Sequence, residues 1–191
     1  MTSTEEKKLL RQRFSVARKK LGSESVRKNG EQILKKLCVL KEFKSAKSIA
    51  TFVDFENEPP TRQLIEKALE MGKTVLVPRT NSAKKTLSFH AIRGLSELKP
   101  NRRGILEPAI EKTELKPHEI DLILVPGLAF DEKGHRLGSG QGYFDRALPK
   151  MKKASKIGIG FEEFVIAKLP IEAHDAKLDA LITEKKVRIF D

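Results

Sequence analysis

Apolar side chains in the first part of the chain recur every three or four positions, as they do on one face of an amphipathic helix. The residues that form this stripe are Leu10, Phe14, Ala17 and Leu21. We therefore predict a helix over residues 4–21, ended by Gly22. A second amphipathic segment follows and predicts another helix, which begins at Ser23.

Beyond the second helix, short apolar runs alternate with further helical patterns. Strands are predicted at residues 48–53, 74–77, 86–92, 121–125, 156–161, 180–183 and 187–190, and helices at 60–71 and 143–148. We expect Pro78 to end the second strand and residues 100–117 to be mainly loop. This alternation predicts the α/β class, as a single three-layer αβα domain over residues 1–191 with a mostly parallel central sheet and helices on both faces.

Composition narrows the class of protein further. The 191 residues are 39% hydrophobic and 34% charged, which is ordinary for a globular domain. The longest apolar runs are strand-sized, and the charged N-terminus has no apolar signal segment, so we expect no membrane partner and a cytoplasmic protein. Cys38 is the only cysteine, which excludes an internal disulfide and a cysteine metal cage.

The net charge of +12 suits nucleic acid, an anionic membrane surface or a phosphorylated small substrate. The chain has no Trp and one Tyr, and it lacks zinc-finger and ribonucleoprotein motifs, so we expect no nucleic-acid partner. The four histidines show no zinc spacing. The tripeptide Gly72-Lys73-Thr74 is not a P-loop, because the glycine required five residues earlier is Lys67.

The loop after the most apolar strand is the strongest candidate for a site. Ligands of open α/β sheets bind beyond the carboxyl ends of the strands. Here residues 126–145 read PGLAFDEKGHRLGSGQGYFD, with glycines at 138, 140 and 142 just before a predicted helix. Such glycines can let backbone N–H groups converge on an anion, although a plain flexible turn is the alternative. Arg136, Tyr143 and Asp145 add groups suited to a phosphate and its Mg²⁺.

This stretch, continued to Leu148, resembles the signature of the 5-formyltetrahydrofolate cyclo-ligase family, close to P-G-x-x-F-D-x-x-G-x-R-L-G-x-G-x-G-Y-Y-D. Weaker matches follow in the family's order and extend the resemblance over nearly the whole chain. They are Lys7 with Leu10-Arg11, Glu58 with Thr61, Val77-Pro78-Arg79, Gly104–Pro108, His174-Asp175, Leu178-Asp179 and Thr183-Glu184.

The resemblance implies ATP- and Mg²⁺-dependent conversion of 5-formyltetrahydrofolate to 5,10-methenyltetrahydrofolate, with release of ADP and phosphate. Phosphoryl transfer to the formyl oxygen would create a leaving group, and folate N10 would then attack the formyl carbon. The implied partner is a folate, with or without a polyglutamate tail, and we expect a monomer. A different ATP-using transferase that has kept the glycine loop is the rival hypothesis.

The resemblance also implies roles for individual residues. Arg136 and Tyr143 are the expected catalytic residues, and Asp145 and Asp175 the expected Mg²⁺ ligands. The expected ATP contacts are Lys7, Lys8, Leu9, Leu10, Arg11, Arg136, Leu137, Gly138, Ser139, Gly140, Gln141, Gly142, Tyr143 and Phe144. The expected folate contacts are Val53, Glu58, Ser139, Gly140, Gln141, Gly142 and Tyr143.

Simpler interpretations stand beside these roles. Glu58 precedes a predicted helix, where a negative charge complements the helix dipole without any ligand, and either aspartate could be a cap or a surface charge. The loop also departs from the family pattern at Ser139, Gln141 and Phe144, where relatives often carry Arg, Gly or Lys, and Tyr. We therefore expect nucleotide affinity to depend on the cations Lys7, Arg11, Arg79 and Arg136.

Overall fold

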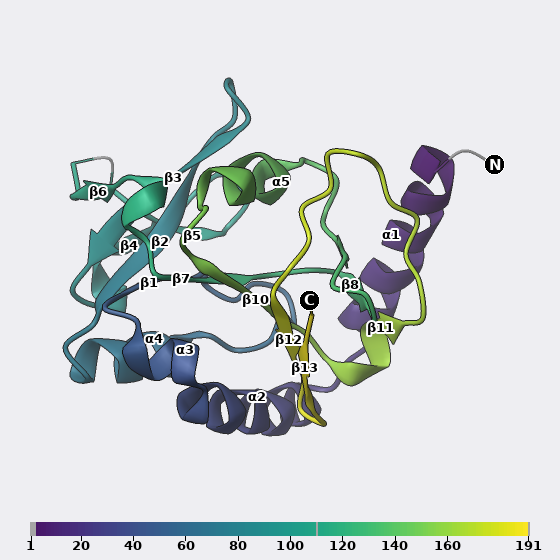
Figure 1. Cartoon of the computed structure of the whole chain (residues 1–191), viewed down its shortest axis with the longest axis horizontal. Helices are drawn as coiled ribbons and strands as arrows, with labels where there is room; N and C mark the ends of the chain where they lie inside the picture. Colours follow the sequence, from purple (N-terminus) through teal and green to yellow (C-terminus); the bar gives the residue numbers. More distant parts are fainter. Residues whose placement is uncertain (1–2, 110, 191) are drawn as a thin grey trace.

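The computed structural model describes residues 3–109 and 111–190 and is built around one large sheet (Figure 1). Its strands are β1 (Ser48–Ala50), β2 (Thr74–Asn81), β3 (Thr86–Ile92), β6 (Glu114–Leu115), β7 (Leu122–Val125), β10 (Ser155–Ile159), β12 (Ala180–Ile182) and β13 (Val187–Ile189). Their order is β13-β12-β10-β7-β1-β2-β3-β6. The strands from β12 to β2 are parallel, and β13, β3 and β6 pair antiparallel at the two margins.

Helices cover both faces of the sheet, as the alternating sequence pattern predicts. The α-helices are α1 (Ser3–Lys19), α2 (Ser23–Val39), α3 (Lys41–Ser45), α4 (Arg62–Glu70) and α5 (Tyr143–Ala147). Figure 1 shows α2, α3 and α4 below the sheet and α5 above it. Leu37 and Phe43 are fully buried on the first face, and Leu148 and Met151 on the second. The αβα architecture is thus confirmed, with the more extensive helical layer on the α2 side.

The central position predicted for the 121–125 segment is confirmed. All four residues of β7 are fully buried, and β7 pairs in parallel with β1 on one side and β10 on the other. A strand covered on both faces must be apolar throughout, which is why this run does not alternate. The carboxyl end of β7 therefore lies in the middle of the sheet, directly before the glycine loop.

The prediction that Pro78 ends a strand is wrong, because β2 continues through it to Asn81. The backbone N–H of Thr51 donates to the carbonyl of Leu76 over 2.9 Å, so Leu76 directs its backbone groups towards the β1 side. Two residues later, the nitrogen of Pro78 faces the same side. Since β1 has already ended at Ala50, no ladder hydrogen bond is lost there.

The segment predicted to be mainly loop contains regular structure. Besides β6, it holds β4 (Leu98–Pro100) paired antiparallel with β5 (Leu106–Pro108), and β5 lies against β2. A second small sheet joins β8 (Ala129–Asp131), β9 (Arg136–Leu137) and β11 (Val165–Ile166). Short 3₁₀ turns complete the chain at Leu95–Glu97, Pro117–Glu119, Leu148–Lys150 and Glu162–Phe164.

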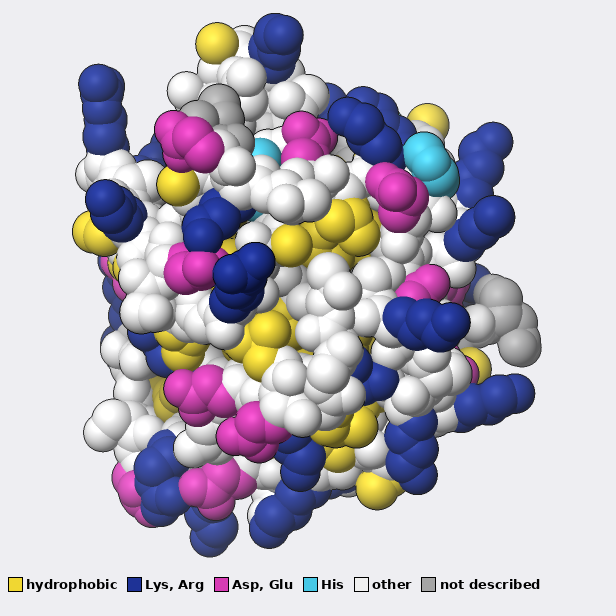
Figure 2. Space-filling view, turned by 90° about the vertical axis from the view of Figure 1, so that its left-hand side faces the viewer, with side chains coloured by type: hydrophobic (Ala, Val, Ile, Leu, Met, Phe, Trp, Pro, Cys, Tyr) yellow, Lys and Arg dark blue, Asp and Glu magenta, His cyan; other side chains and the backbone are white. Residues whose placement is uncertain are grey.

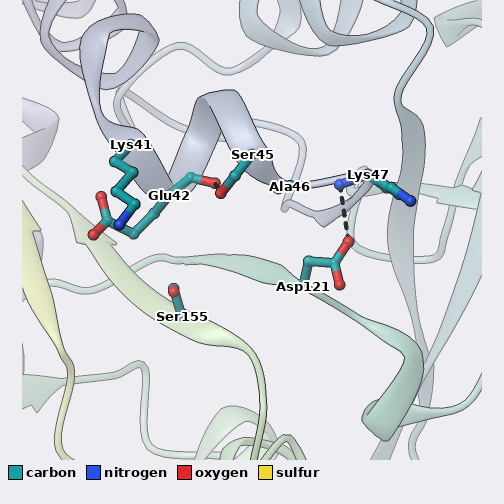
Figure 3. Close-up of a pocket in the computed structure, with 7 residues that line it drawn as sticks. All are labelled: Lys41, Glu42, Ser45, Ala46, Lys47, Asp121 and Ser155. Atoms are coloured by element: carbon teal, nitrogen blue, oxygen red, sulfur yellow. Dashed lines mark hydrogen bonds between the residues drawn. The ribbon is translucent and has the colours of Figure 1, made fainter.

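The amino ends of the parallel strands are joined by a structural contact. Asp121 accepts a hydrogen bond from the backbone N–H of Lys47 over 2.8 Å (Figure 3) and another from that of Ser48 over 2.9 Å. These bonds fix the start of β1 beside the start of β7. Burial opposes ionisation of Asp121, but these bonds outweigh it and lower its pKa. The adjoining hollow of about 430 Å³ lies at the end of the sheet opposite the glycine loop.

Candidate functional site

A cavity of about 810 Å³ opens where the parallel strands end. Its wall combines residues that follow β1 and β7 with the glycine loop, the inner side of α1, the β2–β3 hairpin and the turn before β5. No helix in the described part of the chain is long and apolar enough to span a membrane. On the face shown in Figure 2, Lys and Arg side chains stand among Asp and Glu without forming one continuous basic stripe.

The glycine loop adopts a conformation that larger residues would disturb. Gly142 precedes α5 with φ +66°, in the left-handed region that glycine tolerates. At Gly138, an added Cβ would lie 2.7 Å from Nη1 of Arg136, so a side chain there would displace the guanidinium. The loop backbone and Arg136 are therefore packed as one unit.

Arg136 is the best-enclosed cation of the cavity. Its side chain is 3% exposed, its Nη2 donates to Asp145 Oδ1 over 2.7 Å, and its guanidinium lies 5.5 Å from the ring centroid of Phe144. Burial lowers the pKa of Arg136, although Asp145 and Asp175 oppose the shift. Nε of Arg136 is the one enclosed side-chain polar atom without a partner among the described residues. A buried donor left open in this way suits an anionic ligand.

Helix α1 brings two of the predicted cations to this end of the molecule. Lys7 is buried, and its Nζ lies 2.8 Å from Oε2 of Glu172 and 2.5 Å from Oδ2 of Asp175. Arg11 lines the cavity and donates from Nε to the carbonyl of Gly138 over 3.0 Å. The other expected ATP contacts on α1 are placed differently, since Lys8 and Leu9 are exposed and Leu10 packs against the core.

The other loop residues divide between the cavity wall and the protein interior. Ser139, Gln141, Gly142, Tyr143, Phe144 and Asp145 line the cavity, and so does Val53. Leu137 is buried in the hydrophobic core, and Gly140 lies beside Arg11. Arg146, which the sequence analysis missed, donates to the carbonyls of Gln141 and Lys85 and so joins the loop to the β2–β3 hairpin.

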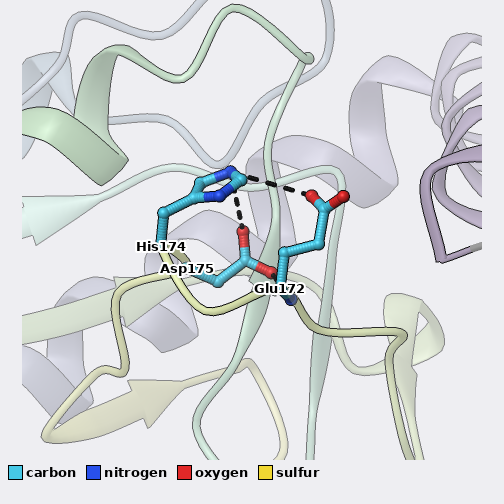
Figure 4. A group of neighbouring side chains, drawn as sticks. All are labelled: Glu172, His174 and Asp175. Carbon is cyan, nitrogen blue, oxygen red and sulfur yellow. Dashed lines mark hydrogen bonds and ion pairs between the residues drawn. The ribbon is translucent and has the colours of Figure 1, made fainter.

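The expected metal ligands are carboxylates held by cations. Asp145 pairs with Arg136 and Asp175 with Lys7, and both carboxylates act on the charge of Arg136. Glu172 and His174 join Asp175 in a group whose potential ligand atoms lie within 4.8 Å of one another (Figure 4). Carboxylate oxygens fit a hard cation such as Mg²⁺. Glu172 could not be found from the sequence, because it belongs to no motif.

Glu58 lines the same cavity as the glycine loop, beside an apolar wall of Phe52, Val53 and Phe55. Its Oε1 accepts from Arg18 Nη1 and its Oε2 from the backbone N–H of Phe55, each over 3.2 Å. Burial raises the pKa of Glu58, although Arg18 opposes the shift. A buried carboxylate beside aromatic rings can bind the N–H edge of a flat heterocycle.

The arginines that line the cavity differ in part from those predicted from the sequence. Arg79 does not line the cavity; its Nη1 donates to the carbonyl of Pro108 over 2.7 Å. Arg102 and Arg103 do line it, from the turn between β4 and β5. The sequence offered no signal for them beyond the high net charge.

A glycine loop packed on a buried arginine, at the carboxyl ends of parallel strands and beside an apolar wall, is typical of α/β enzymes that bind anionic ligands. Comparison with known proteins makes this class specific. The sequence model of the 5-formyltetrahydrofolate cyclo-ligase family matches residues 3–184, and the chain belongs to that family.

Relatives and a solved structure agree with this assignment. The chain is 34% identical to the probable 5-formyltetrahydrofolate cyclo-ligase of Schizosaccharomyces pombe, over 88% of this chain and 90% of that one. It is 32% identical to the enzyme of Escherichia coli K12, over 94% and 98%. The NMR structure of Aquifex aeolicus 5,10-methenyltetrahydrofolate synthetase superposes with a TM-score of 0.86 at 33% identity, covering 96% of this chain and 92% of that one.

These comparisons confirm the predicted family and the prediction that the chain is an enzyme, a ligase of folate metabolism. They leave its cellular location open, because a relative from Arabidopsis thaliana with 27% identity is named a mitochondrial enzyme. The cytoplasmic location therefore stays a prediction.

Proposed function

We propose that this chain uses ATP and Mg²⁺ to cyclise 5-formyltetrahydrofolate to 5,10-methenyltetrahydrofolate, with ADP and phosphate as the other products. The observation that carries the proposal is that one cavity is lined on one side by the glycine loop with Arg136. Its other side is the folate slot, formed by Glu58 and the apolar wall of Phe52, Val53 and Phe55. A nucleotide phosphate and a folate formyl group can therefore meet in one enclosed volume, as phosphoryl transfer between them requires.

The chemistry begins at the formyl oxygen of the folate, which is a poor leaving group. Transfer of the γ-phosphoryl group of ATP to this oxygen gives an imidate phosphate and ADP. N10 then attacks the former formyl carbon, the five-membered ring closes, N10 loses its proton and phosphate departs, which leaves the methenyl cation. Positioning and charge neutralisation are the protein's part in both steps.

The cations of the cavity support the phosphoryl-transfer half of this proposal. Arg136 offers its free Nε and a rigid guanidinium to the phosphate, and Arg11 holds the Gly138 carbonyl and so the shape of the loop. Tyr143, at the start of α5, lines the same wall and would orient the reacting groups. Asp145 and Asp175 would hold Mg²⁺, which neutralises phosphate oxygens when bound.

The slot side supports folate binding. We infer that Glu58 accepts hydrogen bonds from the pterin amino and ring N–H groups, with Val53 and Phe55 against the ring faces. The exposed residues Arg102 and Arg103 at the rim supply positive charge for the glutamate carboxylates, whether one or several. We further infer that residues 1–191 act as one domain and as a monomer.

The test is growth of the methenyl absorbance band in the near ultraviolet. Purified protein is mixed with 5-formyltetrahydrofolate, with ATP and Mg²⁺ supplied together, singly or not at all. The proposal requires the band to grow only when both are present. A flat trace from a protein that binds ATP would refute it and favour a transferase with a different second substrate.

A further inference from the structure

Glu107 is a buried carboxylate of the cavity wall to which the reaction described above assigns no role. It lies on β5, is 8% exposed, and faces the same cavity as Glu58 and Asp145. A buried carboxylate is costly unless something compensates it, so its surroundings show what it can bind.

One oxygen of Glu107 is occupied by the protein. Oε1 accepts from the backbone N–H of Thr80 over 3.3 Å and from Nδ2 of Asn101 over 2.9 Å. Asn101 is itself fixed, because its Oδ1 accepts the backbone N–H groups of Arg103 and Ile105. The carboxylate is therefore held in one orientation by the turn before β5.

The other oxygen, Oε2, is free. No described residue donates a hydrogen bond to it. It is not sealed inside the protein either, since Nε of Arg136 is the one enclosed and unpartnered side-chain polar atom in the described ranges. Because Glu107 lines the cavity, we infer that Oε2 faces it.

Glu107 also differs from Glu58 and Asp145, two other carboxylates of the wall, in having no cation of its own. Glu58 pairs with Arg18 and Asp145 with Arg136, whereas no described residue forms an ion pair with Glu107. Arginines line the same cavity on several sides. A free acceptor among these donors is available to a ligand.

We propose that Oε2 of Glu107 accepts a hydrogen bond from an N–H group of the reduced pterin and so contributes to folate specificity. The inference rests on the proposed function, because the donor belongs to 5-formyltetrahydrofolate. The reduced ring carries several N–H groups on different edges, and a single carboxylate such as Glu58 can pair with only one edge. The arginines around the cavity are donors and cannot satisfy an N–H group.

The substitution Glu107→Gln tests this contact while preserving the fold. The amide oxygen of the introduced side chain can still accept from Thr80 and Asn101. Its NH₂ group then faces the cavity, where it cannot accept a hydrogen bond from the pterin N–H group. Loss of a charge-assisted hydrogen bond weakens binding about ten- to a hundredfold. We expect that increase in the KM for 5-formyltetrahydrofolate, and in its Kd by calorimetry without ATP, with the KM for ATP and the Tm unchanged.

The controls separate this inference from the function on which it depends. Glu114→Gln removes an exposed carboxylate outside the cavity wall and should match the wild type. A wild-type protein that forms no methenyl product refutes the proposed function, whereas an active wild type with a folate Kd unchanged in E107Q overturns only the role of Glu107.

If the Tm of E107Q is lowered, a second variant separates a loss of stability from a loss of the proposed contact. Asn101→Ala removes a bond to Oε1 but leaves Oε2 in place. If both variants weaken folate binding equally, the effect comes from the turn and the proposed contact is wrong.

Discussion

The ion pair of Glu162 with Arg188 should make the stability of the protein depend on acidic pH. Oε1 of Glu162 accepts from Nη2 of Arg188 over 2.7 Å, and Oε2 accepts from Nη1 over 2.9 Å and from the Thr183 hydroxyl over 2.6 Å. The bonds to Arg188 contribute most to lowering the pKa of Glu162 from 4.5 to about 2. The pair joins the strand β13 to the turn after β10, so unfolding breaks it.

The magnitude follows from linkage between protonation and folding. One pKa unit corresponds to about 1.4 kcal/mol, so a fall from 4.5 to about 2 stabilises the folded state by about 3 kcal/mol at neutral pH. The folded pKa is the lower one, so this stability is present above pH 4.5 and is lost as the pH falls towards 2. At pH 3, about 1 kcal/mol remains.

The perturbation is Glu162→Gln, compared with the wild type by urea unfolding between pH 7 and pH 3. We expect the variant to be about 3 kcal/mol less stable at pH 7 and the difference to shrink to about 1 kcal/mol at pH 3. The exposed neighbour is the control, and Glu163→Gln should change stability by less than about 0.5 kcal/mol. A difference that does not vary with pH would refute the reasoning.

Three further predictions concern the cavity and its support. Arg136→Ala should raise the KM for ATP at least about tenfold, because a buried guanidinium loses its charge-assisted bonds to phosphate; an unchanged KM in steady-state assays contradicts its role. Glu58→Ala should weaken 5-formyltetrahydrofolate binding by a similar factor while ATP binding by calorimetry stays intact, and parallel loss of both would count against a separate folate slot. Asp131 is fully buried and accepts hydrogen bonds from the backbone N–H groups of residues 133, 135 and 169 and from the His135 ring. Asp131→Asn should therefore cost about 2–4 kcal/mol in urea unfolding, whereas a cost below about 1 kcal/mol would show that these bonds matter little.

The pattern of apolar and polar residues was sufficient to predict much of the fold. Strand β3 occupies the predicted residues 86–92, and β7 is buried on both faces as its unbroken apolar run required. Both are local properties of the chain, because a strand must match the polarity of the faces it presents. Pro78 misled the analysis because its effect depends on where a neighbouring strand ends, and that is set by contacts far along the chain.

The candidate site was predictable where one segment carries it and not where distant segments meet. Residues 136–145 were predictable as part of the site from their glycines and their family signature. No such pattern marks Arg18 or Glu107, because Arg18 reaches Glu58 from helix α1 and Glu107 is held by contacts with Thr80 and Asn101. Side chains brought together only by tertiary packing leave no spacing pattern in the sequence.

The buried contact between Lys7 and Asp175 has a consequence for synthesis of the chain. The two residues are separated by 168 positions, so helix α1 must wait for the synthesis of 168 further residues before this contact can form. At about 5–20 residues per second, that delay is about 10–30 s. Until the segment that carries Glu172 and Asp175 has left the ribosome, Lys7 on α1 lacks both of these carboxylate partners.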